Sequence, residues 1–361
     1  MAEPFKNLIH EGLVRDLGAR LAAAWPAFPR RRFESRAAGG IASLEMKARA
    51  MQIAAALEDT LPPDFEEAAD IVDAALADGL TGWALWPVGE FVARRGLDAP
   101  ERALRVLHGL TQVFTAEFAI RPFIVRHPAL TWATLARWTA DPSPQVRRLV
   151  SEGSRPRLPW GLQLRSLIAD PSPTLPLLEA LLDDESEIVR RSVANHLNDI
   201  AKDHPHVVAE WVERHLPGAT PARRALLRHA SRSLVKRGDA RVLAAWSQGS
   251  ALRGDATLRI TPKRLALGDR LTLEVTLQPR ARTTQSLVID YAVHHVKASG
   301  GTSAKVFKGW SLELPPGEPR VLRKSHAVKP ITTRRYFSGR HQVDLLVNGR
   351  VAAQAAFDLR V

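Results

Sequence analysis

The apolar residues of the first 245 or so positions recur at intervals of three and four, which is the spacing of one face of an α-helix. The first such face ends at Pro26 and is made by Leu8, Leu13, Leu17, Leu21 and Trp25. Further helices are predicted over residues 41–57, 64–76, 81–95 and 100–121. Turns that contain proline or glycine separate these segments, so the pattern predicts an array of helical hairpins.

The pattern changes near residue 250, where apolar and polar residues begin to alternate. Seven short strands are predicted, over residues 258–260, 271–277, 287–293, 305–312, 320–324, 341–347 and 352–359. Asn348-Gly349 between the last two strands is a strong hairpin signal. This density of strands is typical of an immunoglobulin-like sandwich. We therefore predict a multidomain chain with an all-α domain at 1–247, a linker at Ser247-Gln248-Gly249-Ser250 and an all-β sandwich at 251–361.

The helical part contains an internal repeat. The segment from Asp141 to Arg148 recurs in altered form from Asp184 to Arg191, and Val146 and Val189 fix a period of 43 residues. A third copy begins at Arg223-Arg224 after a shorter interval. Periods of about 40 to 47 residues are those of HEAT repeats, so we predict a HEAT-like solenoid whose inner helices begin at these Val-Arg-Arg segments. In this register Glu152 aligns with Asn195 and Arg228 on a concave face.

Composition narrows the class of protein. The chain has 361 residues, 45% of them hydrophobic, which suffices for two or three domains with cores of their own. It has no cysteine, which excludes a disulfide framework, a thiolate metal site and a cysteine nucleophile. The N-terminal residues lack the layout of a signal peptide, and no apolar run approaches the roughly 18 residues of a membrane span. We expect a cytoplasmic protein with no membrane partner.

The formal charge is +13, and most of it lies in the predicted sandwich. From Arg253 to the C-terminus there are 19 Lys and Arg against 8 Asp and Glu, whereas the residues before Arg253 carry a net charge of only +2. An excess of this kind favours a polyanionic partner, with nucleic acid ahead of a membrane surface.

The segment from Arg147 to Trp160 has the composition of a binding site. It starts as an amphipathic helix with paired arginines and breaks at Glu152-Gly153 into the loop Arg155-Pro-Arg157-Leu-Pro-Trp160. In a structural interpretation Glu152 pairs with Arg148 and Trp160 fills a gap in the core. In a functional one Glu152 faces the groove, while Arg155 and Arg157 hold phosphates.

Two more carboxylates are candidates. We expect Glu117 on a helix face beside Phe114, Phe118 and Arg121, where it forms either a surface ion pair with Arg121 or part of a site. Asp199 lies four residues after Asn195, so both can face the groove, although a solvated helix end is an alternative. The pairs His204/His206 and His294/His295 lack a carboxylate at metal-ligand spacing and are interpreted as structural. We predict no metal and no cofactor.

Three segments resemble the bacterial DNA alkylation-repair glycosylases of the AlkC branch: Thr115 to Phe123, Ser151 to Trp160, and Arg190 to Asp199. The basic C-terminal domain is similar to the extension found on some AlkC members and absent from the AlkD branch. The resemblance implies a monomeric, monofunctional DNA glycosylase of base excision repair. Its substrates would be cationic alkylated bases in double-stranded DNA, 3-methyladenine and 3-methylcytosine, which it excises without extruding the base into a pocket.

The resemblance also implies the residues of the site. Catalysis would fall to Glu117, Glu152, Asp199 and Trp160 around the lesion. DNA would be held by Arg121, Arg147, Arg148, Arg155, Arg157, Arg190, Arg191, Asn195 and Arg228. A base that is already cationic leaves without a general acid, so carboxylates that stabilise an oxocarbenium-like sugar and orient a water would suffice. The alternative is a non-catalytic HEAT-repeat scaffold that binds nucleic acid or protein.

Overall fold

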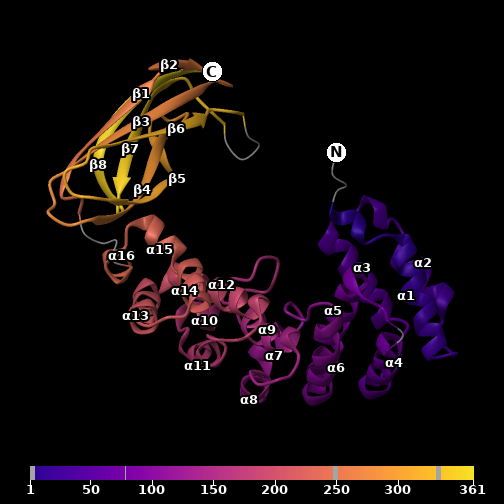
Figure 1. Ribbon diagram of the computed structural model, residues 1–361. Helices are drawn as coiled ribbons and strands as arrows, with labels where there is room; N and C mark the ends of the chain where they lie inside the picture. The colour runs from indigo at the N-terminus through magenta and orange to yellow at the C-terminus, as the bar shows by residue number, and fades with distance from the viewer. Residues whose placement is uncertain (1–4, 78, 247–250, 331–334) are drawn as a thin grey trace. The chain divides into compact units, whose positions relative to one another are not determined.

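The computed structural model describes residues 5–77, 79–246, 251–330 and 335–361 (Figure 1). The chain divides into two compact units, residues 1–203 and 204–361. The α-helices of the first unit are α1 (Glu11–Ala24), α2 (Arg30–Ala38), α3 (Met46–Glu58), α4 (Phe65–Ala77), α5 (Leu85–Arg95), α6 (Pro100–Val113), α7 (Arg121–Arg126), α8 (Pro128–Trp138), α9 (Pro144–Gly153), α10 (Arg165–Ala169), α11 (Leu175–Ala180) and α12 (Glu187–Asp203). Short 3-10 helices are η1 (Phe5–Leu8), η2 (Ile41–Ser43), η3 (Gly82–Ala84), η4 (Gly96–Asp98) and η5 (Ser172–Thr174).

The helix predicted over 100–121 is shorter than expected. Helix α6 ends at Val113 because Phe114 leaves the helical conformation, with φ −148° and ψ −123°. The Phe114 ring packs edge-on against Trp83, with 5.3 Å between ring centroids. The chain resumes a helix at Arg121, where Pro122 suits the first turn of α7 because it needs no backbone donor. Glu117 therefore lies in a turn, and its predicted place on a helix face is wrong.

The 43-residue repeat is visible in the hydrogen bonds at the starts of α9 and α12, which pack against each other. Arg147 Nη1 donates to the carbonyls of Asp141 and Pro142 at 2.8 and 3.1 Å. One period later, Arg190 Nη1 donates to the carbonyls of Asp184 and Glu185 at 2.6 and 2.7 Å. In both repeats the turn aspartate accepts a 2.8 Å bond from the backbone of the serine two residues on. Equivalent residues thus build equivalent turns.

The second unit joins four helices to a β-sandwich. Its helices are α13 (Pro205–His215), α14 (Pro221–Ala230), α15 (Arg232–Arg237) and α16 (Ala240–Ala245). Its strands are β1 (Gly254–Thr261), β2 (Arg264–Ala266), β3 (Arg270–Pro279), β4 (Gln285–Val296), β5 (Thr302–Leu314), β6 (Arg320–Ala327), β7 (Gly339–Val347) and β8 (Arg350–Arg360). One sheet has the order β1-β3-β6, and the other has the order β2-β8-β7-β4-β5. The seven predicted strands are confirmed, and the three-residue β2 is an addition.

The alternation of apolar residues explains the sandwich. Leu271, Leu273, Val275 and Leu277 on β3 are all buried, and they face the buried residues of β4 and β7. The predicted hairpin turn joins β7 to β8, with Asn348 and Gly349 both at positive φ, as a type I′ turn requires.

The helices α13 to α16 belong with the strands. Gly238, which ends α15 in a left-handed conformation, lies against Gly349 so closely that a Cβ at position 238 would stand 2.9 Å from the Gly349 carbonyl oxygen. The linker predicted at 247–250 falls outside the described residues, and the domain limits 1–247 and 251–361 stay a prediction. None of the described helices combines the length and apolar character that a membrane crossing requires.

Candidate active site

Glu152 sits in the last turn of α9 and is 6% exposed. Its Oε1 accepts a 2.5 Å bond from Arg155 Nη1, and its Oε2 accepts a 2.6 Å bond from the Ser192 hydroxyl on α12. The expected pairing with Arg148 is replaced by this pairing with Arg155. The carboxylate is thus held at both oxygens by the loop after α9 and by the neighbouring inner helix.

Arg155 joins two of the predicted carboxylates. Its Nη1 contacts Glu152, and its Nε and Nη2 both lie 2.8 Å from Asp199 Oδ2. Asp199 is 2% exposed, so it is not a solvated helix end, and its Oδ1 accepts a 2.7 Å bond from Lys202 Nζ. Arg155 therefore serves as the link between α9 and α12, and its charge is already engaged by two carboxylates.

Glu117 is joined to this cluster by an ion pair with Arg148 of α9. Arg148 Nη2 donates to Glu117 Oε2 at 2.8 Å, and the Thr115 hydroxyl donates to that same oxygen at 2.7 Å. The Glu117 side chain retains 12% of its exposure and that of Arg148 retains 29%. Of the three carboxylates, Glu117 is thus the one that a bound molecule reaches with the least rearrangement.

Arg121 does not occupy the position predicted for it. Its side chain is fully buried, and it donates through Nη1 to the Gly153 carbonyl at 2.8 Å and through Nε to the Leu162 carbonyl. It forms no ion pair with Glu117. A guanidinium with no exposed surface has no room for a phosphate, so the structure is at odds with a direct DNA contact by Arg121.

Trp160 is exposed beside this cluster. The indole is 58% exposed and stacks on Trp86 of α5, with 6.1 Å between centroids and 12° between planes. Trp86 in turn stacks on Phe118 at 5.1 Å. Trp160 has a φ of 64°, which is uncommon for a bulky residue, and Lys47 Nζ of α3 donates to its carbonyl at 3.1 Å. The indole is therefore mostly exposed to solvent, and its expected alternative as a plug in the core is wrong.

Neighbouring charges and hydrogen bonds keep the side chains of Glu152 and Arg155 ionised despite their burial. Burial works to raise the pKa of Glu152, but the charges of Arg155 and Arg148 and the hydrogen bonds from Ser192 and Arg155 hold that pKa below its ordinary value. Burial works to lower the pKa of Arg155, while Glu152 and Asp199 bring it above its ordinary value. At neutral pH Glu152 is therefore an anion, which is suited to stabilise positive charge and not to donate a proton.

The other predicted DNA-binding residues differ in how exposed they are and in what they contact. Arg147 is 8% exposed and forms a two-pronged ion pair with Asp184, so it secures the repeat and is not available to a phosphate. Arg157 is partly exposed and forms a two-pronged pair with Asp203. Exposed or partly exposed side chains are those of Arg190, Arg191 and Asn195 on α12. Arg228 belongs to the second unit, where its guanidinium lies 5.1 Å from the Trp246 ring centroid.

Several residues of the site were not singled out from the sequence. Ser192 and His196 lie one turn apart on α12, and both face α9. His196 Nδ1 donates to the Ser151 carbonyl at 2.9 Å, and burial lowers the pKa of this imidazole to about 4, so it is neutral. Their spacing of four residues on a helix with a predicted inner face was the available signal. Trp86 had a weaker signal, a second tryptophan three residues after Trp83.

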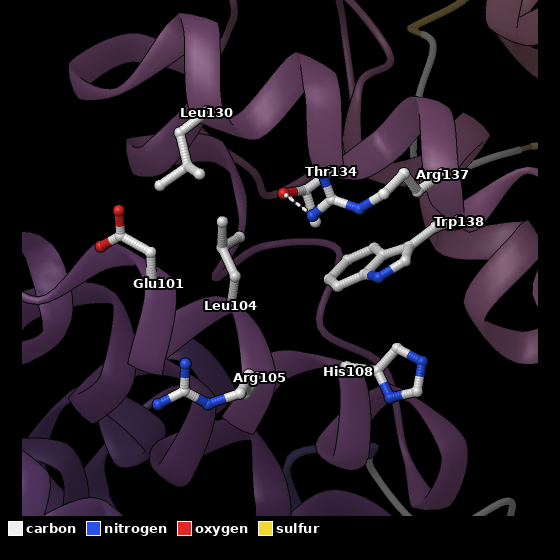
Figure 2. A pocket seen from close by; sticks show the side chains of 8 residues that line it. All are labelled: Glu101, Leu104, Arg105, His108, Leu130, Thr134, Arg137 and Trp138. Carbon is white, nitrogen blue, oxygen red and sulfur yellow. Dashed lines mark hydrogen bonds between the residues drawn. The ribbon is translucent and has the colours of Figure 1, made fainter.

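A separate hollow of about 580 Å³ opens between α6 and α8. Figure 2 shows Leu104, Arg105 and His108 of α6 opposite Thr134, Arg137 and Trp138 of α8. The Thr134 hydroxyl accepts a 3.0 Å bond from Arg137, and His108 Nε2 lies 2.7 Å from Asp141 Oδ2. None of the predicted catalytic residues lines this hollow, so the carboxylate cluster is the better candidate for chemistry.

Comparison with known families defines the class of protein. Residues 113–234 match the family described as DNA alkylation repair enzyme, and this range contains all four predicted catalytic positions. Residues 255–361 match the C-terminal Ig-like domain of the uncharacterised protein YhaZ. A helical alkylation-repair region is thus followed by an immunoglobulin-like domain.

Two full-length similarities place the chain more closely. The uncharacterized protein YhaZ of Bacillus subtilis (strain 168) is 35% identical over 361 residues, which cover 98% of this chain and 99% of YhaZ. The Pseudomonas fluorescens alkylpurine DNA glycosylase AlkC, in a structure bound to DNA containing an abasic site analog, is 35% identical. It superposes with a TM-score of 0.92 over 99% of this chain and 100% of AlkC. This chain therefore belongs to the AlkC branch of the DNA alkylation repair enzymes.

Proposed function

We propose that this chain is a DNA glycosylase of base excision repair that hydrolyses the N-glycosidic bond of cationic alkylated bases in double-stranded DNA. The substrates proposed are 3-methyladenine and 3-methylcytosine. The observation that carries the proposal is that Arg155 and Ser192 hold both carboxylate oxygens of Glu152, contacts that keep its pKa below the ordinary value. An ionised Glu152 does not donate a proton, and a base that is already cationic leaves without a proton donor.

The roles of the carboxylates follow from their exposure. Glu117 is the most accessible of the three, so we assign to it the contact with the developing oxocarbenium-like sugar or with the attacking water. Glu152 and Asp199 are nearly buried and share Arg155, so they act on the reacting sugar through the charge of the whole cluster. The exposed face of Trp160 is suited to stack on the deoxyribose or the cationic base.

The monofunctional reaction, in which water and not an amine attacks the sugar, is supported by the neighbouring lysines. Lys202 Nζ donates to Asp199 Oδ1, and Lys47 Nζ donates to the carbonyl of Trp160. An attacking amine must offer a free lone pair, which a hydrogen-bonded ammonium does not have. Strand cleavage at the abasic product is therefore not expected.

DNA is proposed to be held by exposed or partly exposed basic residues beside the cluster, namely Arg148, Arg157, Arg190 and Arg191, with Asn195. Each has side-chain surface in contact with solvent. The buried Arg121 and Arg147, and Arg155, whose side chain is 11% exposed, are proposed to support the site from within. The surplus charge of the sandwich adds affinity that does not depend on sequence.

Release of methylated bases is the direct test. The protein is incubated with N-methylated duplex DNA, and released 3-methyladenine and 3-methylcytosine are quantified against spontaneous loss. Release no faster than spontaneous loss would refute the proposal. The rival function, a non-catalytic scaffold, is favoured by one observation, that Glu152 and Asp199 already form ion pairs with Arg155. It predicts DNA binding without base release.

Excision without extrusion of the base has its own test. 2-Aminopurine placed opposite or beside the lesion becomes brighter when bases unstack. Under the proposal its fluorescence stays near that of the free duplex when the protein binds. A strong increase that accompanies binding would show that the lesion base leaves the stack.

A further inference from the structure

Arg121 is the buried side chain that ties together both ends of the loop carrying Trp160. Its Nη1 bonds the carbonyl of Gly153, the last residue of α9, and its Nε bonds the carbonyl of Leu162, just beyond Trp160. The carbonyls at the end of a helix have no partner within the helix, so a side chain that accepts this task fixes where the helix ends. One guanidinium thus sets the span between α9 and the far end of the loop.

The packing around Arg121 leaves little freedom. A Cβ at Gly153 would stand 2.6 Å from Ile120 Cγ2, so α9 passes against the residue before Arg121 with no space for a side chain. A Cβ at Gly161 would stand 3.3 Å from both Cδ and Nε of Arg121. The residue after Trp160 therefore lies directly on the arginine.

Trp160 needs such support because of its backbone. A φ of 64° for a tryptophan costs energy, and residues in this region persist where the surroundings determine their conformation. The Lys47 ammonium holds the Trp160 carbonyl from α3, and Gly161 N donates to the Leu158 carbonyl at 3.2 Å. Arg121 fixes the other end of the loop through its hydrogen bond to the Leu162 carbonyl.

The charge of Arg121 lies among the same carboxylates. Burial and the charge of Arg155 together lower the pKa of Arg121 to about 10, although the charges of Asp199, Glu117 and Glu152 act in the opposite direction. It remains a cation at neutral pH. Its Nη2 has no acceptor among the described residues, a cost that a neutral residue would avoid. Two features explain an arginine at this position: its hydrogen bonds to the carbonyls of Gly153 and Leu162, and its positive charge, on which the three carboxylates act.

We infer that Arg121 is a positioning residue, which fixes the loop that carries Trp160 and supplies a buried positive charge on which the charges of the three carboxylates act. This inference rests on the proposed function for its effect on excision, but not for its effect on the position of Trp160.

The first test follows Trp160 itself. The full chain is labelled with 5-fluorotryptophan, and the Trp160 resonance among the nine tryptophans is assigned with Trp160→Phe. Arg121→Lys, which keeps the charge but loses the fork, is expected to shift or broaden that resonance. The matched control is Arg49→Lys, because Arg49 is also buried and donates to the backbone carbonyls of Lys6, Ile9, Ala42 and Leu44. It should leave the Trp160 resonance in place.

The second test separates positioning from stability. Excision per folded molecule should fall by about 10- to 100-fold in Arg121→Lys, since a displacement near 1 Å can cost about 100-fold, while duplex binding changes little. Arg49→Lys should lower the melting temperature but not the excision rate per folded molecule. If Arg121→Lys leaves both the resonance and the rate unchanged, or if Arg49→Lys changes both as much, the inference is wrong.

The charge is tested by the pH dependence of excision. The charges of Glu117, Glu152, Asp199 and Arg155 act on Arg121, that of Arg148 acts on Glu152, and His196 in the same cluster is neutral. Removal of a cation raises the pKa of the carboxylates, so in Arg121→Met the acid limb of the rate should move to higher pH, whereas Arg121→Lys keeps it in place. If the acid limb of a folded Arg121→Met does not move, the charge role is refuted. If that variant does not fold, Arg121→Lys alone decides the positioning role.

These outcomes remain separate from the proposed function. If the wild-type protein releases no methylated base, the glycosylase proposal fails, yet the fluorine spectrum still shows whether Arg121 fixes Trp160. If the wild-type protein is active and the Trp160 resonance ignores Arg121→Lys, the positioning role fails and the glycosylase proposal stands.

Discussion

Arg148 Nη2 lies 2.8 Å from Glu117 Oε2, and this contact joins helix α9 to a turn 31 residues earlier in the chain. The pair brings the most accessible carboxylate to the end of α9 where Glu152 is held. Arg148 also stands 3.4 Å from the Thr115 hydroxyl, so the carboxylate is oriented by two donors that contact each other. The acid cluster is thus assembled by arginines, each reaching from one segment to the next.

Replacing Glu117 with Gln should slow excision by about 100-fold, because a neutral amide does not stabilise the developing cation. Duplex binding should change by less than about threefold, since the side chain contributes little to holding the phosphates. Single-turnover excision and fluorescence anisotropy measure the two quantities. Glu101→Gln, on the exposed rim of the hollow between α6 and α8, is the matched control and should be active. Equal losses of binding and excision in Glu117→Gln would make the residue structural.

Trp160→Ala should reduce excision on the order of tenfold through loss of a stacking surface for a cation. Because the indole is 58% exposed, the loss of unfolding free energy should be small. Trp160→Phe, which keeps an aromatic ring against Trp86, should retain most of the activity. The comparison requires excision rates and thermal melts of both variants. An alanine variant as active as the phenylalanine variant would show that the indole does not touch the substrate.

His196 should make the stability of the first unit depend on pH. Its pKa is lowered by burial from 6.5 to about 4, so the unfolded chain binds a proton more readily than the folded one. The stabilising contribution is complete above pH 6.5 and is lost as pH falls toward 4, by about 3 kcal/mol in all. Urea unfolding at several pH values above 5, where carboxylates titrate little, measures this slope.

The matched substitutions for this slope are His196→Gln and His206→Gln. Glutamine at 196 still donates to the Ser151 carbonyl but has no proton to gain, so the dependence on pH should flatten. His206 is exposed, and its substitution should leave the slope unchanged. A slope that persists in His196→Gln would assign it to another group.

The basic sandwich should determine part of the salt dependence of DNA binding. Lys308→Gln and Arg320→Gln remove exposed cations from β5 and β6, and each lost phosphate contact should lower the slope of log affinity against log salt by about 0.9. Arg31→Gln on α2 is an exposed control in the other unit. Point substitutions are preferable to deletion of the sandwich because α15 packs against it through Gly238 and Gly349. An unchanged slope would mean that neither Lys308 nor Arg320 contacts a phosphate.

The sequence predicted the helices and strands more reliably than it predicted the contacts between side chains. Two-residue alternation located seven strands, most clearly β3, whose apolar residues are buried on one face, while β2 has only three residues, too few for a pattern. The repeat was readable because Val146 and Val189 begin equivalent buried helix turns. The end of α6 at Phe114 was not readable, since contacts of Phe114 and Phe118 with Trp83 and Trp86 override a continuous helical pattern there.

The candidate site was found as a set of residues, but their partners were not. A sequence shows that Arg121, Arg147, Arg148 and Arg155 are basic, and it does not show which of them are buried. Arg121 is drawn inside by two carbonyls that only the folded loop brings together, and Arg147 by an aspartate 37 residues later. Local spacing favoured a pair between Arg148 and Glu152, whereas the fold offers Arg148 a carboxylate from another turn.

The ion pair between Arg147 and Asp184 has a consequence for local opening. Arg147 holds the carbonyls of its own turn and the carboxylate that organises the turn of the next repeat, and both side chains are nearly buried. If one of the two turns opened alone, the nearly buried charge of the other turn would lose its partner, which is costly. Helices α9 and α12 should therefore exchange their backbone amide protons as one cooperative unit, and the segments that carry Glu152 and Asp199 should share one free energy of opening.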